Sequence, residues 1–201
     1  MVYAENKGRH WVPLLIMLIL ALCCTALFYA VPMETTMEIS SQESPWFSVT
    51  NGILYFDKSK YTGSSQLTVP DKIDGAVITV ISEGCFRDCE ELTEVRLPDT
   101  LNAIGEEAFS GCTGLRGIEI PASVVFVGKG VFSGCSALEA ACISNNLQHI
   151  GTGAFDGYTN FHYVYFLGDF QEWTTLYRDF IGPKVVISCD DGKFYQSGDH
   201  A

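Results

Sequence analysis

Cysteine is the residue type in this sequence best suited to chemistry, because thiolates bind metals and act as nucleophiles. Cys89, Cys112 and Cys135 follow one another at intervals of 23 residues. A tetrahedral zinc site needs four ligands, and neither a Cys-x-x-Cys pair nor a nearby histidine supplies them. Phenylalanine and leucine flank each of the three positions. The sequence therefore predicts three buried thiols in an apolar environment and no metal site.

Other patterns that would indicate catalysis or cofactor binding are incomplete in this sequence. The four histidines form no His-Glu-x-x-His pair, and no Gly-x-Ser-x-Gly turn is present. Gly128-Lys129-Gly130 lacks the rest of a phosphate-binding loop, and Asp190-Asp191-Gly192 is too short for a calcium loop. We therefore expect no catalytic residues and no cofactor. The formal net charge of −12 repels phosphate backbones, so we expect no nucleic-acid partner.

The interval of 23 residues also orders the apolar residues. The four apolar columns are Ile81, Ile104, Val127 and Ile150; Phe86, Phe109, Phe132 and Phe155; Leu92, Leu115, Leu138 and Phe161; and Leu97, Ile120, Ile143 and Phe166. A period of about 20–29 residues is typical of leucine-rich-repeat solenoids. One coil cannot bury its own apolar face, so coils must stack with their strands about 4.8 Å apart. The predicted fold is an α/β-type repeat solenoid made mostly of short β-strands and turns.

Two segments carry a resemblance to a known family. Ile104 to Cys112, which reads Ile-Gly-Glu-Glu-Ala-Phe-Ser-Gly-Cys, and Ile150 to Phe155 resemble the core motif of BspA-like leucine-rich repeats. The resemblance covers about residues 53–195, and it departs from the family at Cys85, where the family favours alanine. It implies a right-handed leucine-rich-repeat solenoid that is not an enzyme and that binds host, matrix or neighbouring-cell proteins.

The N-terminal segment from Trp11 to Val31 holds 21 residues without a charge, which is long enough for a transmembrane helix. Lys7 and Arg9 precede it, so we expect a cytoplasmic N-terminus and an extracytoplasmic repeat domain. A cleaved signal peptide, which would give a secreted protein, is the alternative, although Phe28 does not suit the cleavage site.

Changes in composition and period along the chain predict its domain boundaries. We expect residues 1–10 to be a cytoplasmic N-terminus, 11–31 the membrane helix or signal anchor, and 32–46 an exposed linker. A β-hairpin cap with a tight turn at Asn51-Gly52 should occupy 47–66, the repeats 67–167, and a C-terminal cap and tail 168–201.

Strand alternation predicts which residues of the repeats point outward. Among these, the charged and aromatic side chains are candidates for partner binding: Glu94, Arg96, Glu119, Tyr163 and Tyr165. We expect Arg96 and Glu119 to pair across neighbouring strands, and tyrosine is enriched at binding hot spots. In the alternative, the two tyrosines only cover the C-terminal cap. Two further outward residues are noted, Cys142 as the most exposed thiol and Phe126 as a second surface candidate.

The sequence thus favours a cell-surface adhesion module whose partner is another protein. Two alternatives from other classes remain at this stage. The chain could be a structural spacer that binds no separate ligand. It could also be a non-catalytic subunit of a membrane complex, with Ala21, Cys24 and Ala26 lining a helix–helix contact.

Overall fold

The computed structural model describes residues 38–40, 43–157, 160–176 and 185–196. The chain divides into two units, Met1–Thr35 and Thr36–Ala201, and all of the described residues belong to the second. The predicted membrane segment Trp11 to Val31 therefore lies outside the described residues. Within them, no helix has both the length and the apolar character needed to cross a membrane.

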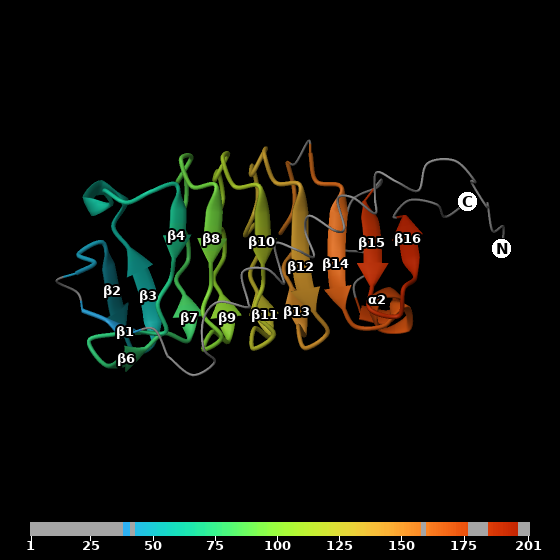
Figure 1. Ribbon diagram of the computed structural model, residues 1–201, viewed down its shortest axis with the longest axis horizontal. Helices are drawn as coiled ribbons and strands as arrows, with labels where there is room; N and C mark the ends of the chain where they lie inside the picture. The colour runs from blue at the N-terminus through green and yellow to red at the C-terminus, as the bar shows by residue number, and fades with distance from the viewer. Residues whose placement is uncertain (1–37, 41–42, 158–159, 177–184, 197–201) are drawn as a thin grey trace. The chain divides into compact units, whose positions relative to one another are not determined.

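The described unit is a solenoid of about five coils, whose short strands form two rows (Figure 1). The first row contains β4 (Gln66–Thr68), β8 (Glu94–Arg96), β10 (Gly117–Glu119), β12 (Ala140–Ser144), β14 (Tyr163–Leu167) and β15 (Val186–Cys189). The second row contains β3 (Ile53–Phe56), β7 (Val80–Ile81), β9 (Ala103–Ile104), β11 (Phe126–Val127) and β13 (His149–Ile150). All strand pairs within these two rows are parallel, as the repeat requires, and only β8 and β10 are neighbours without a shared ladder.

The core between the rows is formed by the apolar columns that the sequence predicted. The phenylalanine rings stack from coil to coil, with centroid distances of 5.0, 5.6 and 5.2 Å along Phe86, Phe109, Phe132 and Phe155. These four rings are at most 2% exposed to solvent. Because every ring contacts the next, each coil buries the apolar face of its neighbour.

The N-terminal end is closed by two small antiparallel elements. Strand β2 (Phe47–Thr50) pairs with β3, and the turn between them has positive φ at Asn51 and Gly52, which suits a tight hairpin. The first coil is longer than the others, and its extra residues form a second hairpin from β5 (Lys72–Ile73) and β6 (Ala76–Val77). A short 3-10 helix, η1 (Lys58–Lys60), connects β3 to β4.

The described part of the segment 32–46, which the sequence predicted as an exposed linker, pairs with the first coil. Strand β1 (Glu38–Ile39) pairs in parallel with β5, so Ile39 lies in register with Ile73. Ser44 is buried, and Trp46 packs edge-on against Tyr61 with their ring centroids 5.3 Å apart. This segment belongs to the N-terminal cap because backbone pairing, which needs no apolar sequence, holds it to the first coil.

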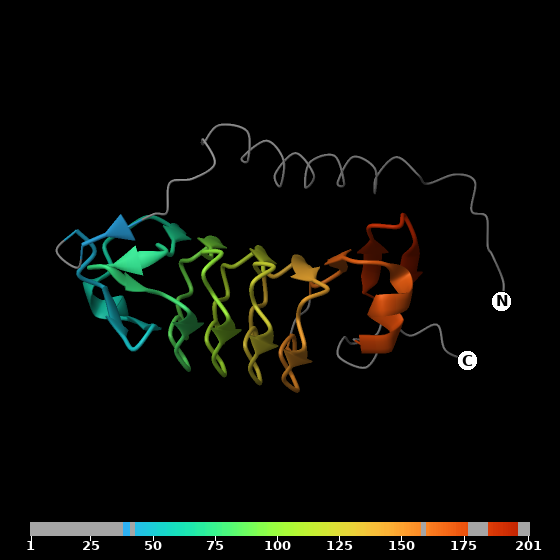
Figure 2. The same cartoon turned by 90° about the horizontal axis from the view of Figure 1, so that it is seen from below.

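The C-terminal end is closed by α2 (Phe170–Leu176) and β16 (Phe194–Gln196), which pairs antiparallel with β15 (Figure 2). Asp169 and Glu172 form a reciprocal capping box: the Glu172 N–H donates to Asp169 Oδ1 at 2.9 Å, and the Asp169 N–H to Glu172 Oε2 at 3.0 Å. The cap fixes the start of α2 and places Trp173 against Phe166, with ring centroids 5.3 Å apart. The indole thereby covers the last coil of the core.

Glycine lets successive coils approach closely. A Cβ atom at Gly128 would lie 2.6 Å from the backbone nitrogen of Glu106 in the preceding coil, and Gly105 and Gly151 have equivalent contacts. We expect Gly128→Ala to lower the free energy of unfolding by about 1–3 kcal/mol, because coils must separate to admit the methyl group. Gly117→Ala is the matched control, since its Cβ would meet only the Ala140 carbonyl oxygen at 3.8 Å. Urea unfolding of both variants tests this, and equal stabilities would contradict it.

Candidate functional site

The five residues predicted to bind a partner all lie on the first row of strands. Glu94 and Arg96 are on β8, Glu119 is on β10, and Tyr163 and Tyr165 are on β14. Their neighbours on the same strands, Val95, Ile118 and Val164, are buried in the core. The alternation therefore turns the predicted residues toward the outer side of this row, which we call the first-row face.

The strand register arranges this face in lines. Gly117, Ala140, Tyr163 and Val186 are aligned on successive strands, and Glu119, Cys142, Tyr165 and Ser188 form the next line. The ladder is interrupted between β8 and β10, which belong to different sheets. The structure thus brings Glu119 and Tyr165 into one line, while Glu94 and Arg96 lie beyond the interruption.

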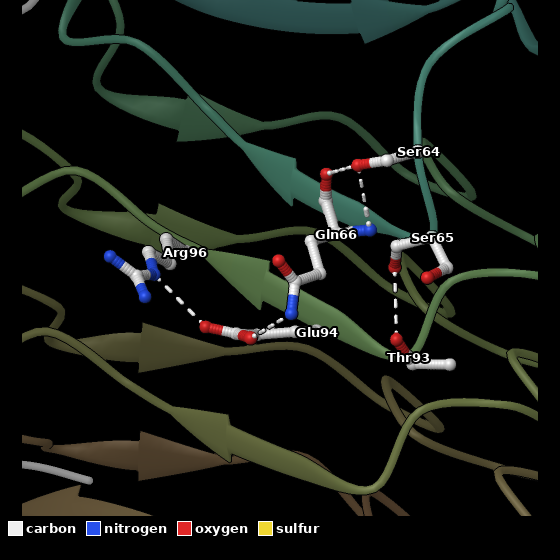
Figure 3. A network of polar contacts seen from close by, with 6 residues as sticks. All are labelled: Ser64, Ser65, Gln66, Thr93, Glu94 and Arg96. Atoms are coloured by element: carbon white, nitrogen blue, oxygen red, sulfur yellow. Dashed lines mark hydrogen bonds and ion pairs between the residues drawn. The ribbon is translucent and has the colours of Figure 1, made fainter.

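A polar network fixes the side chains on the N-terminal side of the interruption (Figure 3). Arg96 Nε lies 3.0 Å from Glu94 Oε1, and Gln66 Nε2 donates to Glu94 Oε2 at 3.0 Å. The Thr93 hydroxyl donates to the Ser65 carbonyl at 3.2 Å, which joins the same two strands. Both sides of the Glu94 carboxylate are therefore occupied by partners on β4 and β8.

The cross-strand pair expected between Arg96 and Glu119 is wrong, because Arg96 pairs with Glu94 instead. Residues 94 and 96 point to the same side of one strand, so their side chains meet without any help from a ladder. Arg96 and Glu119 are not joined by an ion pair within 4.0 Å, although the charge of Arg96 still lowers the pKa of Glu119. An exposed ion pair of this kind contributes at most about 1 kcal/mol to the free energy of unfolding. Its main effect is to hold the Arg96 side chain beside Glu94.

Glu119 is a carboxylate of the face whose pKa is raised above its ordinary value. Partial exclusion of water raises the pKa of its carboxyl group, Asp99 raises it further, and Arg96 lowers it. Throughout the described ranges, Glu119 makes neither an ion pair within 4.0 Å nor a side-chain hydrogen bond. Asp99 is a member of this site that the sequence analysis missed, although its position just after β8 could have revealed it.

The C-terminal part of the face is aromatic. Tyr163 and Tyr165 are half-buried, so part of each side chain is covered, and Leu167 on the same strand is 41% exposed. The neighbouring positions on β12 and β10 hold the small residues Ala140 and Gly117. Large side chains thus stand beside small ones, and Leu167 enlarges the patch that the sequence predicted. The roles of all these residues in binding stay a prediction.

The six cysteines in the described ranges are thiols. Cys112 and Cys135 are buried, as the sequence predicted, and their Sγ atoms donate to the carbonyls of Phe86 at 3.0 Å and Phe109 at 3.1 Å in the preceding coils. Burial raises the pKa of Cys85 and of Cys135 to about 12, and that of Cys189 to about 11. Cys142 is only half-buried, and it lies between Glu119 and Tyr165 on the first-row face.

The second row of strands carries a smaller exposed feature. Phe126 is 41% exposed, and its ring stacks on His149 of the next coil with centroids 4.8 Å apart and planes 12° apart. The sequence predicted Phe126 as a surface residue but did not predict its contact with His149, although the two residues are one repeat apart. Within the described part of the chain, no group of three or more His, Cys, Asp or Glu side chains could hold a metal ion.

The stacked coils, the 23-residue register and the two rows of parallel strands define a leucine-rich-repeat solenoid. The family model for the BspA type leucine rich repeat region matches residues 59–176 in six copies, which is more than half of the chain. The chain therefore belongs to this family, and the resemblance drawn from the sequence is confirmed. Repeat solenoids of this kind are typically non-catalytic scaffolds that bind through extended surfaces.

Solved structures share the fold. A leucine-rich repeat protein from Bacteroides capillosus ATCC 29799 has a TM-score of 0.53 at 24% identity, over 61% of this chain and 93% of that chain. A leucine rich cell surface protein from Faecalibacterium prausnitzii A2-165 has a TM-score of 0.50 at 18% identity, over 65% of this chain and 42% of its own. This chain thus matches less than half of that protein's length. No curated protein matches the chain.

We expect Cys142 to react first among the described cysteines when the native full-length protein is treated with a maleimide at about pH 8. The other described thiols are buried and, apart from the weaker rise at Cys89, have strongly raised pKa values, so they stay protonated. Peptide mass mapping identifies the modified residue, and Cys142→Ser is the control. Early labelling of Cys112 or Cys135 would show that the coils open more readily than the packing implies.

Proposed function

We propose that this chain is a protein-binding module that uses the first-row face, with Glu94, Arg96, Glu119, Tyr163 and Tyr165 in contact with the partner. The observation that carries this proposal is the line-up of two half-buried tyrosines, an exposed leucine and small neighbours on rigid, laddered strands. Tyrosine contributes large contact areas at low entropic cost and is enriched at hot spots. A face fixed by the repeat loses little conformational freedom when it binds.

The proposed location of this module is the outer side of a membrane. The uncharged stretch from Trp11 to Val31 supports an anchor, and Lys7 and Arg9 on its N-terminal side support a cytoplasmic start. The shared fold with the Faecalibacterium prausnitzii cell surface protein is in keeping with such a location. Adhesion to host, matrix or neighbouring-cell proteins is the activity that we assign to a module in this position.

The binding role of the tyrosines can be tested by replacement. We expect the double variant Tyr163→Ala, Tyr165→Ala to bind its partner at least about tenfold more weakly. The reason is that removal of a hot-spot side chain costs about 2 kcal/mol or more of binding free energy. Tyr55→Ala is a matched control, since Tyr55 is exposed on β3 in the second row. The full-length protein and its variants are immobilised, and proteins retained from an extracellular extract are quantified by mass spectrometry.

Candidate partners are the proteins that the wild-type chain and the control Tyr55→Ala retain in equal amounts. Circular dichroism melting of each variant verifies that the solenoid stays folded. If the double tyrosine variant retains the same proteins in the same amounts, the first-row face is not the binding surface.

The location can be tested separately with a C-terminal tag on the full-length protein in intact cells. We expect an external protease to remove the tag, and the undigested protein to keep its full mass and to sediment with membranes. A shortened, released protein would indicate signal cleavage and secretion. A protected tag would place the repeats on the inner side and contradict the adhesion role.

A further inference from the structure

The first-row face has an uneven distribution of charge. Glu94, Arg96 and Glu119 on this face, together with Asp99 in the turn after β8, carry three negative charges and one positive charge, which leaves −2. Arg96 is already held by Glu94 at 3.0 Å, whereas neither Asp99 nor Glu119 has an ion-pair partner in the described ranges. The acidic side chains without an ion-pair partner are therefore Asp99, in the turn after β8, and Glu119, on β10.

The aromatic part of the face begins two strands away from this charge. Glu119, Cys142 and Tyr165 are aligned on β10, β12 and β14, so the Cα atoms of Glu119 and Tyr165 lie about 10 Å apart. The residue between them is small and half-buried. A long aliphatic side chain of a partner, with a cationic end, has the length to lie across Cys142. Its charge would then lie at Glu119, and its stem, or the next residue of the partner, would lie on Tyr165.

A basic side chain complements this line in both of its properties. Asp99 and Glu119 are both exposed, and their carboxylates attract a guanidinium or ammonium group. A tyrosine ring accepts both the aliphatic stem and a cation above its face. An acidic segment would instead meet two like charges, and an uncharged apolar segment would leave the carboxylates uncompensated.

We propose that the partner presents a segment with an arginine or lysine beside an apolar residue, and that the basic side chain lies along Glu119, Cys142 and Tyr165. The apolar residue then contacts Tyr163 or Leu167. This inference rests on the proposed function, because it names the partner chemistry of the same face. The acidic body of the chain, with a net charge of −12, favours the same class of partner at long range.

The test uses a library of random peptides displayed on phage, selected against the full-length protein. Enriched peptides are synthesised, and their affinities are measured by fluorescence polarisation for the wild-type chain, Glu119→Gln, Glu119→Lys and Glu106→Gln. Glu106 is a matched control because it is an exposed glutamate in the loop that follows β9, in the second row. Each peptide is also made with alanine in place of its basic residue.

We expect the enriched peptides to carry arginine or lysine next to an apolar residue. Glu119→Gln should weaken their binding roughly two- to fivefold, as for a partly exposed ion pair, and Glu119→Lys more strongly. Glu106→Gln should have no effect, and the alanine-substituted peptide should no longer distinguish Glu119→Gln from the wild-type chain. Equal affinities of the alanine-substituted peptide for the wild-type chain and Glu119→Gln would show that Glu119 interacts with the basic side chain of the peptide.

Two other outcomes would overturn the inference, and they differ in what they say about the proposed function. Peptides that need Tyr163 and Tyr165 but carry no basic residue, or that bind Glu119→Gln as well as wild type, would remove the cationic partner and leave the binding face in place. If no enriched peptide depends on the two tyrosines, both the inference and the proposed function fail.

Discussion

The structure depends on one packing constraint: no coil can bury its apolar residues without the next coil. The stacked rings of Phe86, Phe109, Phe132 and Phe155 satisfy this constraint along the axis of the solenoid. Their spacing sets the separation of the strands, and the separation leaves no room for a Cβ atom at Gly128. Strand register, glycine positions and the need for a cap at each end all follow from it.

The same constraint creates the first-row face. Because alternate residues of each strand must point into the core, the residues between them are turned outward and aligned from coil to coil. This alignment requires no particular outward residue, so those positions are open to a role in binding. Polar and charged residues such as Glu94, Arg96 and Glu119 occupy them in the early coils and tyrosines in a late one, which gives the face two regions of different chemistry on one rigid support.

The sequence predicted the features that repeat and the Asn51-Gly52 hairpin, and it missed contacts that depend on local geometry. The column that contains Phe109 and the outward position of Tyr163 follow from a 23-residue period that can be read directly. The choice of Glu94 rather than Glu119 as the partner of Arg96 could not be predicted, because both carboxylates lie within reach in a repeat and the period does not distinguish them. Strand β1 was missed because it spans only Glu38–Ile39 and pairs with β5, which lies far away in the sequence.

The central claim is that the first-row face, and not the rest of the surface, contacts a protein partner. Photocrosslinking in the producing cells tests it most directly, with p-benzoylphenylalanine placed at position 142 in one variant and at position 106 in another. The account predicts a discrete crosslinked protein from position 142, between Glu119 and Tyr165, and none from position 106 on the other side of the coils. Equal adducts from both positions, or an adduct from 106 alone, would contradict it.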